Sequence, residues 1–230
     1  MFGIFVDASP NTTKIPNMKT LVIKTLCVNG DRGVSFSAWL KSKTADKVLS
    51  PIRDRVFDLI DEGSQVLEVG CGTGDLLFRA SNKIDYGLGV DLDQGMIEFA
   101  NKRVEEEKVE NIEFIEKDIK SLSDSLLRKF NISTSTLCFH EMREEDAISS
   151  LSLLAKHSSK VIIADYAPPN TVWGKVSIEL DEMISGHYGK FKSYREKGGI
   201  PYLAKASGLK VVSEMGTPID GILIWVLSGR

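Results

Sequence analysis

The fold of this chain is decided by one stretch of sequence: Val66-Leu67-Glu68-Val69-Gly70-Cys71-Gly72-Thr73-Gly74-Asp75. The first four residues read as a buried strand, and a helix is predicted over residues 75–81, so the glycines fill the turn between them. Glycine permits a sharp turn and carries no β-carbon that would keep a ligand away. The start of the helix offers free N–H groups and a positive dipole end, which suit a carboxylate or a phosphate. The stretch therefore predicts a ligand-binding loop at the end of a strand.

Strands and helices alternate along the chain on both sides of this loop. This order predicts an α/β protein with a Rossmann-like, doubly wound sheet that is mostly parallel and carries helices on both faces. Two late strands, 209–215 and 222–227, are joined by a connection too short for a crossover helix, so we expect them to pair antiparallel. The other predicted strands are 66–69, 86–90, 111–116, 132–139 and 160–164, and the other helices are 93–107 and 144–157.

The N-terminal part is predicted to be separate from this unit. Residues 1–49 read as an extension, a loose tail followed by a helical cap near residues 18–30. A helix is expected to start at Ser50, which can cap it, with Pro51 in its first position. We therefore expect an extension over 1–49 and one domain over 50–230, with residues 171–200 as a lid over the acceptor site.

Composition narrows the function classes. The 29 Lys and Arg against 32 Asp and Glu give a formal charge of −3, which does not favour a nucleic-acid binder. No apolar run approaches the roughly 20 residues of a transmembrane segment. Three scattered cysteines fit a reducing, cytoplasmic setting and show no metal-ligand spacing, and we expect no metal site. Nothing in the sequence fixes an oligomeric state.

Two further acidic positions follow the next two predicted strands. Asp91 stands 17 positions after Gly74, where a neighbouring parallel strand places a carboxylate beside a ribose. Asp118 follows the third strand and can accept from an exocyclic adenine amine. Leu92, Met96 and Ile119 are expected to form apolar walls around the base.

This set of residues resembles the class I S-adenosylmethionine-dependent methyltransferases. Glu68-x-Gly70-x-Gly72-x-Gly74 is similar to their first motif, Asp91 to their ribose-binding acid, and Asp118-Ile119 to their adenine-contacting pair. The segments 136–142 and 191–209 resemble the small-molecule branch that includes enzymes of the ubiquinone and menaquinone biosynthesis type. The resemblance implies a seven-stranded sheet with an antiparallel last strand, S-adenosylmethionine as cofactor, Ser135 as a cofactor contact, and in-line methyl transfer to a small-molecule acceptor.

Two residues have a structural alternative to their functional role. The resemblance places Glu68 below the methionine end of the cofactor, but it can also be a strand residue paired with a nearby helix end. His140 lies beside the expected methyl donor and is the candidate catalytic base, since histidine is suited to remove a proton from an acceptor oxygen or nitrogen. It can equally be a histidine that caps the next helix or is hydrogen-bonded in the core.

Three other functions remain possible at this level. An NAD(P)-dependent oxidoreductase shares the glycine turn and the ribose acid, but its fingerprint requires glycine or alanine where Asp75 stands. A methyltransferase-like protein could bind the cofactor without turnover. A protein or RNA acceptor would call for a broad charged groove, which nothing in the sequence demands.

Overall fold

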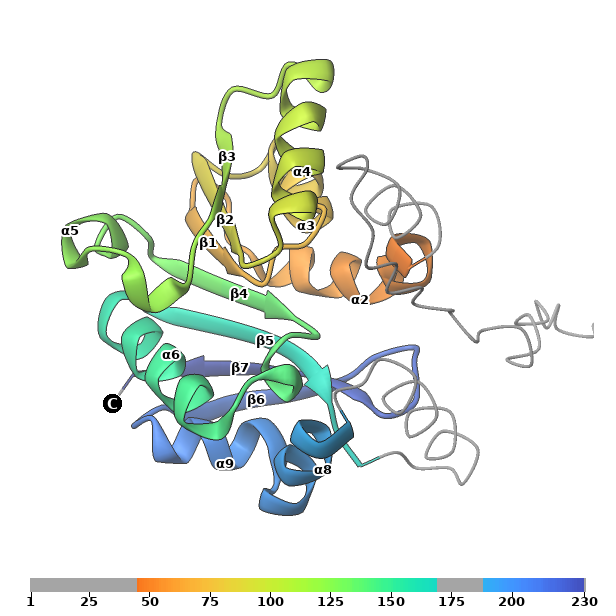
Figure 1. Ribbon diagram of the computed structural model, residues 1–230, viewed down its shortest axis with the longest axis vertical. Coiled ribbons are helices and arrows are strands. Elements are labelled where there is room, and N and C mark those ends of the chain that lie inside the picture. Colours follow the sequence, from red (N-terminus) through yellow and green to blue (C-terminus); the bar gives the residue numbers. More distant parts are fainter. Residues whose placement is uncertain (1–44, 169–187, 230) are drawn as a thin grey trace, which may run out of the picture.

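A single sheet of seven strands forms the centre of the computed structural model, in the order β3-β2-β1-β4-β5-β7-β6 (Figure 1). The structure describes residues 45–168 and 188–229. The first five strands run parallel, and β7 runs antiparallel to both β5 and β6, as predicted for the late pair. The strands are β1 (Gln65–Val69), β2 (Tyr86–Asp91), β3 (Ile112–Glu116), β4 (Ile132–Thr136), β5 (Lys160–Tyr166), β6 (Lys210–Gly216) and β7 (Ile222–Ser228).

Helices cover both faces of this sheet (Figure 1), which confirms the doubly wound arrangement. One buried apolar cluster lies under α2, α3 and α4, and a second lies under α5, α6 and α9 on the opposite face. The helices and 3₁₀ turns are α2 (Ala45–Leu59), α3 (Asp75–Ala80), α4 (Gln94–Glu107), η2 (Ile119–Ser121), α5 (Asp124–Leu127), η3 (Phe139–Glu141), α6 (Glu144–His157), α8 (Tyr188–Lys197) and α9 (Gly199–Ala206).

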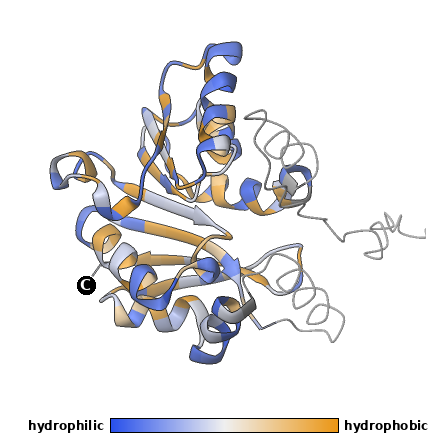
Figure 2. Ribbon diagram, viewed as in Figure 1, coloured by the Kyte–Doolittle hydropathy of each residue, from blue (hydrophilic) through white to orange (hydrophobic). Residues whose placement is uncertain are grey.

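The central strands follow from their residue types. Residues 161–164 of β5 are fully buried and contact the two clusters alternately, as expected of a parallel strand covered on both faces. β5 is accordingly one of the most hydrophobic strands in Figure 2, whereas its neighbour β4 is paler because four of its five residues are Ser or Thr.

The register of the parallel strands brings their carboxyl ends to one edge of the sheet. Val69 of β1 lies beside Val90 of β2, and Asp91 lies beside Glu116 of β3. On the other side of β1, Glu68 lies beside Thr134 of β4. The loops that follow β1, β2, β3 and β4 therefore meet at this edge, where the sequence predicted the cofactor site.

The predicted start of the first helix at Ser50 is wrong. α2 is described over Ala45–Leu59 and continues through Pro51, so it also crosses the predicted domain boundary. Ser-Pro is typical of a helix start because proline lacks the N–H that a helix interior uses. Here a tertiary contact holds the N-terminal part of the helix: the buried side chain of Asp46 accepts a hydrogen bond from Thr73 of the glycine loop at 2.7 Å and also binds Arg53, two turns further along α2.

The fourth strand is shorter than predicted. β4 ends at Thr136, and Leu137 adopts a left-handed conformation with φ 52°, which breaks the strand. His140 therefore lies in the short turn η3 rather than at the end of a strand.

Some predicted features fall on residues outside the described ranges. These are the helix near residues 18–30, most of the extension 1–49, and residues 171–187 of the predicted lid. In the described ranges, every helix is too short or too polar to cross a membrane.

Candidate cofactor and acceptor site

The glycine loop is bound to the end of the neighbouring strand. The N–H groups of Gly70 and Cys71 both donate to the carbonyl of Val90 in β2, at 2.9 and 3.1 Å. Gly74 N–H donates back to the carbonyl of Cys71 at 2.9 Å and closes the turn. The loop thus has a fixed shape before any ligand binds.

The three predicted glycines are required for different reasons, although all have positive φ. A β-carbon on Gly70 would lie 2.4 Å from Cys138 Sγ, and one on Gly74 would lie 2.4 Å from the ring of Phe114. At Gly72 a β-carbon would meet no atom within 4 Å. Gly70 and Gly74 therefore allow close packing, and Gly72 is the position where the loop backbone faces open space that a ligand can approach.

Asp91 lies beside Gly72, as the ribose assignment requires. Its Oδ2 accepts from Gly72 N–H at 2.8 Å, and its Oδ1 accepts from Asp93 N–H at 3.0 Å. A carboxylate oxygen has two lone pairs, so each oxygen can accept one more hydrogen bond. The carboxylate is held in place by two backbone donors and retains acceptor capacity for two ribose hydroxyls.

The predicted adenine contacts lie around the ends of β2 and β3. The side chain of Leu92 is 71% exposed, although leucine is usually buried. Met96 and Ile119 are buried, and Asp118 caps η2 by accepting from Lys120 N–H at 2.9 Å. An apolar surface beside a partly exposed carboxylate is what an adenine ring needs.

Glu68 is buried in the floor of the site. It is 2% exposed, and its Oε2 finds no hydrogen-bond partner among residues 45–168 and 188–229. Burial raises the pKa of Glu68 to about 8; Arg53 opposes this shift, and Asp75, Asp91 and Asp46 add to it. A buried carboxyl group with no partner holds its proton because the charged form would lose its hydration.

A buried ionic cluster between α2 and the glycine loop surrounds Glu68. Arg53 binds Asp46 at 2.7 Å and Asp75, the first residue of α3, at 3.3 Å. Thr73 of the loop donates to the other oxygen of Asp46 at 2.7 Å. We did not predict this cluster, since Asp46 and Arg53 stand in a separate helix well before the glycines and match no local motif.

Ser135 and Cys138 lie behind the loop. Ser135 is fully buried, and its hydroxyl donates to the carbonyl of Val69 at 2.8 Å, which joins β4 to the end of β1. A direct cofactor contact by Ser135 remains a prediction. Cys138, which packs against Gly70, is a site residue that the sequence analysis missed.

His140 forms a pair with Asp165, the second residue that the sequence analysis missed. Both are buried, and His140 Nδ1 lies 2.6 Å from Asp165 Oδ1. Asp165 also accepts from the backbone N–H groups of Phe139, His140 and Tyr166 at 2.8–3.3 Å. Three backbone N–H groups already point at the Asp165 carboxyl group, and a carboxylate oxygen only accepts hydrogen bonds, so we assign Nδ1 of the ring as the donor and Nε2 as the basic nitrogen.

Aromatic side chains enclose the imidazole ring. The rings of Tyr166, Phe191 and Tyr194 lie edge-on to His140, with centroids 4.6, 6.2 and 6.4 Å away. Two of them, Phe191 and Tyr194, belong to α8, which lies in the described part of the predicted lid segment. The lid segment therefore contacts the candidate base.

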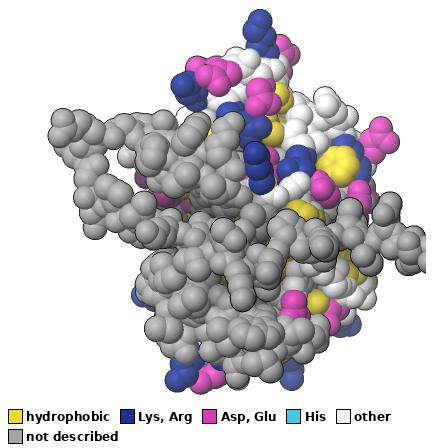
Figure 3. Space-filling model, turned by 90° about the vertical axis from the view of Figure 1, so that its right-hand side faces the viewer, with side chains coloured by type: hydrophobic (Ala, Val, Ile, Leu, Met, Phe, Trp, Pro, Cys, Tyr) yellow, Lys and Arg dark blue, Asp and Glu magenta, His cyan; other side chains and the backbone are white. Residues whose placement is uncertain are grey.

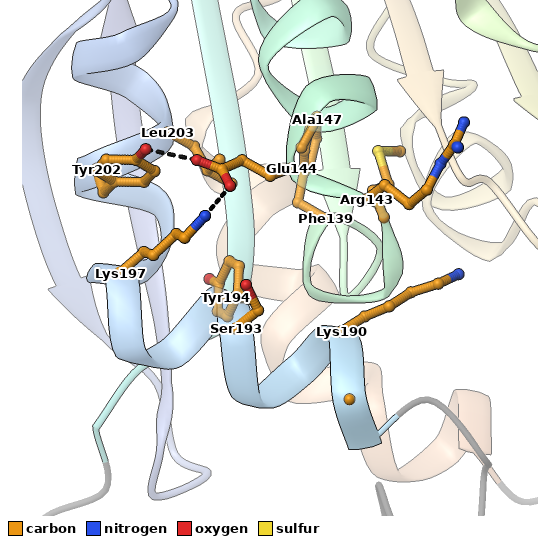
Figure 4. A pocket seen from close by; sticks show the side chains of 12 residues that line it. Phe139, Arg143, Glu144, Ala147, Lys190, Ser193, Tyr194, Lys197, Tyr202 and Leu203 are labelled. Atoms are coloured by element: carbon orange, nitrogen blue, oxygen red, sulfur yellow. Dashed lines mark hydrogen bonds and ion pairs between the residues drawn. The ribbon is translucent and has the colours of Figure 1, made fainter.

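One of these rings, Tyr194, also lines a cavity of about 280 Å³ between α8, α9 and the start of α6 (Figure 4). Phe139 and Met142, on either side of His140 in the chain, line it together with Tyr194. Glu144 accepts hydrogen bonds there from Lys197 and, at 2.5 Å, from Tyr202. The cavity thus combines apolar walls with polar groups that already bind one another.

A family model described as "Methyltransferase domain" matches residues 60–204, which is more than half of the chain. The chain belongs to this methyltransferase domain family. The match includes the glycine loop, Asp91, Asp118, His140 and Asp165. The resemblance found in the sequence, to class I S-adenosylmethionine-dependent methyltransferases, is thereby confirmed.

Curated relatives match parts of this methyltransferase domain. Aklanonic acid methyltransferase DauC from Streptomyces sp. (strain C5) is 35% identical over 86 residues, 34% of this chain and 39% of that protein. The uncharacterized methyltransferase YcgJ from Bacillus subtilis (strain 168) is 28% identical over 126 residues, 53% of this chain and 46% of that protein. The aligned part of this chain thus spans less than half the length of each of these relatives.

A solved structure shows the same fold. An S-adenosylmethionine-dependent methyltransferase from Clostridium acetobutylicum ATCC 824 superposes with a TM-score of 0.60, at 13% identity, over 84% of this chain and 97% of that one. The strand order with an antiparallel β7 is therefore that of the class I methyltransferase fold.

The residues present in the methyltransferase domain fit S-adenosylmethionine, the cofactor of this family. Gly72 leaves open space beside the carboxylate of Asp91, and Leu92 is an exposed apolar residue where the base is expected. The buried Glu68 oxygen without a partner matches the positively charged methionine end of that cofactor. Three parts of the ligand thus have complementary groups at one edge of the sheet.

The ribose assignment can be tested by Asp91→Ala. We expect the affinity for S-adenosylhomocysteine to fall at least about 100-fold, because two hydrogen bonds to a charged group are lost. Isothermal titration calorimetry measures the change. Asp85→Ala is the matched control, since Asp85 is exposed and stands just before the opposite end of the same strand. Unchanged affinity in Asp91→Ala would contradict the assignment.

The burial of Glu68 predicts a pH-dependent stability. The pKa of Glu68 is about 8 in the folded chain against an ordinary 4.5, so between these pH values the folded state binds the extra proton. The free energy of unfolding therefore falls as pH rises through this range, by at most about 1.4 kcal/mol per pH unit. The Glu68→Gln variant should not show this loss of stability, because glutamine does not titrate. Denaturant unfolding should show that the free energy of unfolding of the variant rises relative to that of the wild type from pH 5 to pH 8.5. If the two free energies change with pH in the same way, Glu68 is not buried as a neutral acid.

Proposed function

We propose that this chain transfers the methyl group of S-adenosylmethionine to a small-molecule acceptor. The observation that carries the proposal is the meeting of the glycine loop, Asp91 and the buried Glu68 at one edge of the sheet, next to the His140–Asp165 pair. S-adenosylmethionine supplies a methyl group that is already activated by a positive sulfur. The protein's task is then to align the two substrates and exclude water.

In this proposal each cofactor-binding residue has one role. Asp91 accepts from the ribose hydroxyls, Asp118 accepts from the adenine amine, and Glu68 lies under the methionine end. The backbone of Gly70, Gly72 and Gly74 leaves room for the ligand. Leu92, Met96 and Ile119 form the apolar walls around the base.

His140 is the proposed general base. Asp165 holds the imidazole with Nδ1 as donor, and Glu141 Oε1 lies 3.7 Å from Nε2 on the other side of the ring. When Nε2 takes a proton from an acceptor O–H or N–H, two carboxylates stabilise the positive charge that forms. Asp165 acts here as a positioning residue, because it touches the ring and not the acceptor.

Several features support a small acceptor that enters between the N-terminal extension and residues 171–200. Phe191 and Tyr194 of that segment contact His140, and Tyr194 also lines the cavity of about 280 Å³. One curated relative is named for aklanonic acid, itself a small molecule. Over the described part of the face in Figure 3, Lys and Arg mix with Asp and Glu, which does not suggest a nucleic-acid surface. Cys71 and Cys138 are free thiols, in keeping with a proposed cytoplasmic setting.

The proposed activity can be tested directly with a panel of acceptors. We expect the chain to convert S-adenosylmethionine to S-adenosylhomocysteine only with certain phenols, carboxylic acids, amines or carbon acids, each recovered one methyl group heavier by mass spectrometry. Asp91→Ala should be inactive in the same assay. Binding of S-adenosylhomocysteine without methylation of any acceptor would favour a protein that binds the cofactor without turnover. Thermal stabilisation by NADH but not by S-adenosylhomocysteine would favour the oxidoreductase.

The role of His140 can be tested with an acceptor found in this way. If the acceptor carries an O–H or N–H, His140→Ala should lower kcat by roughly 10²- to 10⁴-fold and leave the affinity for S-adenosylhomocysteine within about twofold. Asp165→Asn should lower kcat in the same direction. The lost rate should return partly at high pH, where the acceptor ionises without a base. Unchanged kcat in His140→Ala would leave the histidine with a structural role only.

A further inference from the structure

In the described ranges, the carboxyl group of Glu68 forms no ion pair, and one of its oxygens, Oε2, has no hydrogen-bond partner. Arg53 is the cation that lowers the pKa of Glu68, but this guanidinium already binds Asp46 and Asp75. Thr134 is the residue of β4 that lies beside Glu68 in the sheet. It is fully buried, and its hydroxyl also lacks a hydrogen-bond partner in the part of the chain that the structure describes. Glu68 is therefore a buried acid next to neutral or already paired groups.

The other groups that face Glu68 make a negative charge there still less favourable. Among residues 45–168 and 188–229, the groups that interact electrostatically with Glu68 are Asp46 and Arg53 of α2, Asp75 of α3, Asp91 of β2 and the thiol of Cys71 in the loop. In this described part of the chain, three acidic side chains thus accompany one buried arginine. A fourth negative charge would thus be added to a region that is already acidic and shielded from water, and the free protein avoids it by keeping Glu68 protonated.

A ligand with a positive charge changes this balance. The methionine end of S-adenosylmethionine and of S-adenosylhomocysteine carries an ammonium group, whereas 5′-methylthioadenosine has the same nucleoside and lacks that group. A cation near a buried carboxyl group favours the carboxylate. It also removes the excess of negative charge that kept the proton in place.

We propose that Glu68 is a specificity-determining residue that releases its proton to solvent when the ammonium group of the cofactor binds, so that the ligand's positive charge replaces the proton. In this step the O–H bond of the carboxyl group breaks, the electron pair stays on the carboxylate and the proton goes to buffer. The inference rests on the proposed function, because it assigns the ligand's charged end to this site. It gives the site a preference for cationic nucleosides over neutral or anionic ones.

The inference predicts how affinity depends on pH. In the free protein the Glu68 carboxyl group holds a proton below about pH 8, and binding of the ligand requires the loss of this proton. The affinity for S-adenosylhomocysteine should therefore fall up to about tenfold for each pH unit between pH 8 and pH 6. The affinity of 5′-methylthioadenosine should not change with pH in this way.

Calorimetry in two buffers tests the proposal. Titration of S-adenosylhomocysteine into the full chain at pH 7, in phosphate and in Tris, gives the number of protons released from the difference in heat. With a pKa of about 8, roughly nine of ten Glu68 side chains are protonated at pH 7. Wild type should therefore release nearly one proton more than Glu68→Gln. The ligand's own amine, mostly protonated at pH 7, contributes little.

Two controls make the result specific. Glu105→Gln removes an exposed glutamate of α4 and should keep the wild-type proton count. In wild type, 5′-methylthioadenosine should bind without proton release. Equal release from this ligand, or equal counts in wild type and Glu68→Gln, would overturn the proposal.

The outcomes also separate this inference from the proposed function. Binding of S-adenosylhomocysteine without proton release would overturn only the role of Glu68. Absence of binding would overturn the cofactor assignment and this inference together. If Glu68→Gln does not fold, the wild-type affinity between pH 6 and pH 9 decides: a pH-independent dissociation constant for S-adenosylhomocysteine would overturn the proposal.

Discussion

The hydrogen bond from Gly72 N–H to the carboxylate of Asp91 is the contact on which the site depends. It joins the loop after β1 to the end of β2, and the carbonyl of Val90 strengthens the same junction by accepting from Gly70 and Cys71. These bonds fix the loop and aim the carboxylate at the open side of Gly72. A ligand then meets a preformed surface, so little binding energy is spent on ordering the loop.

A layer of buried charge lies behind that surface. Arg53 and Asp46 of α2 bind Thr73 of the loop and Asp75 of α3, and Glu68 lies beside them with an Oε2 that has no hydrogen-bond partner in the described part of the chain. Such a cluster contributes little net stability, because desolvation offsets much of the attraction between the charges. In our proposal its main effect is on the charge that the site accepts, and this effect favours a ligand with a positive end.

The proposed cofactor-binding groups and the candidate base lie on different halves of the sheet. The ends of β1, β2 and β3 carry the proposed cofactor-binding groups, and the ends of β4 and β5 carry His140 and Asp165. Cys138 packs against Gly70 and connects the halves at their boundary. The candidate base is thus held by the same sheet edge as the glycine loop, although its partner Asp165 is 25 residues away in the chain.

The sequence alone determined the layered fold and the meeting of the glycine loop with Asp91 at one edge of the sheet. Apolar runs and periodic patterns are local, so they predicted all seven strands, and the glycine spacing with Asp91 predicted the loop and its acid. The tertiary structure decided what depends on distant contacts. Asp46 extends α2 beyond Ser50, Leu137 ends β4 early, and Asp165 pairs with His140. Whether Glu68 is charged also depends on burial beneath α2, since a carboxyl group's ionisation is set by the water and charges around it and not by its neighbours in the chain.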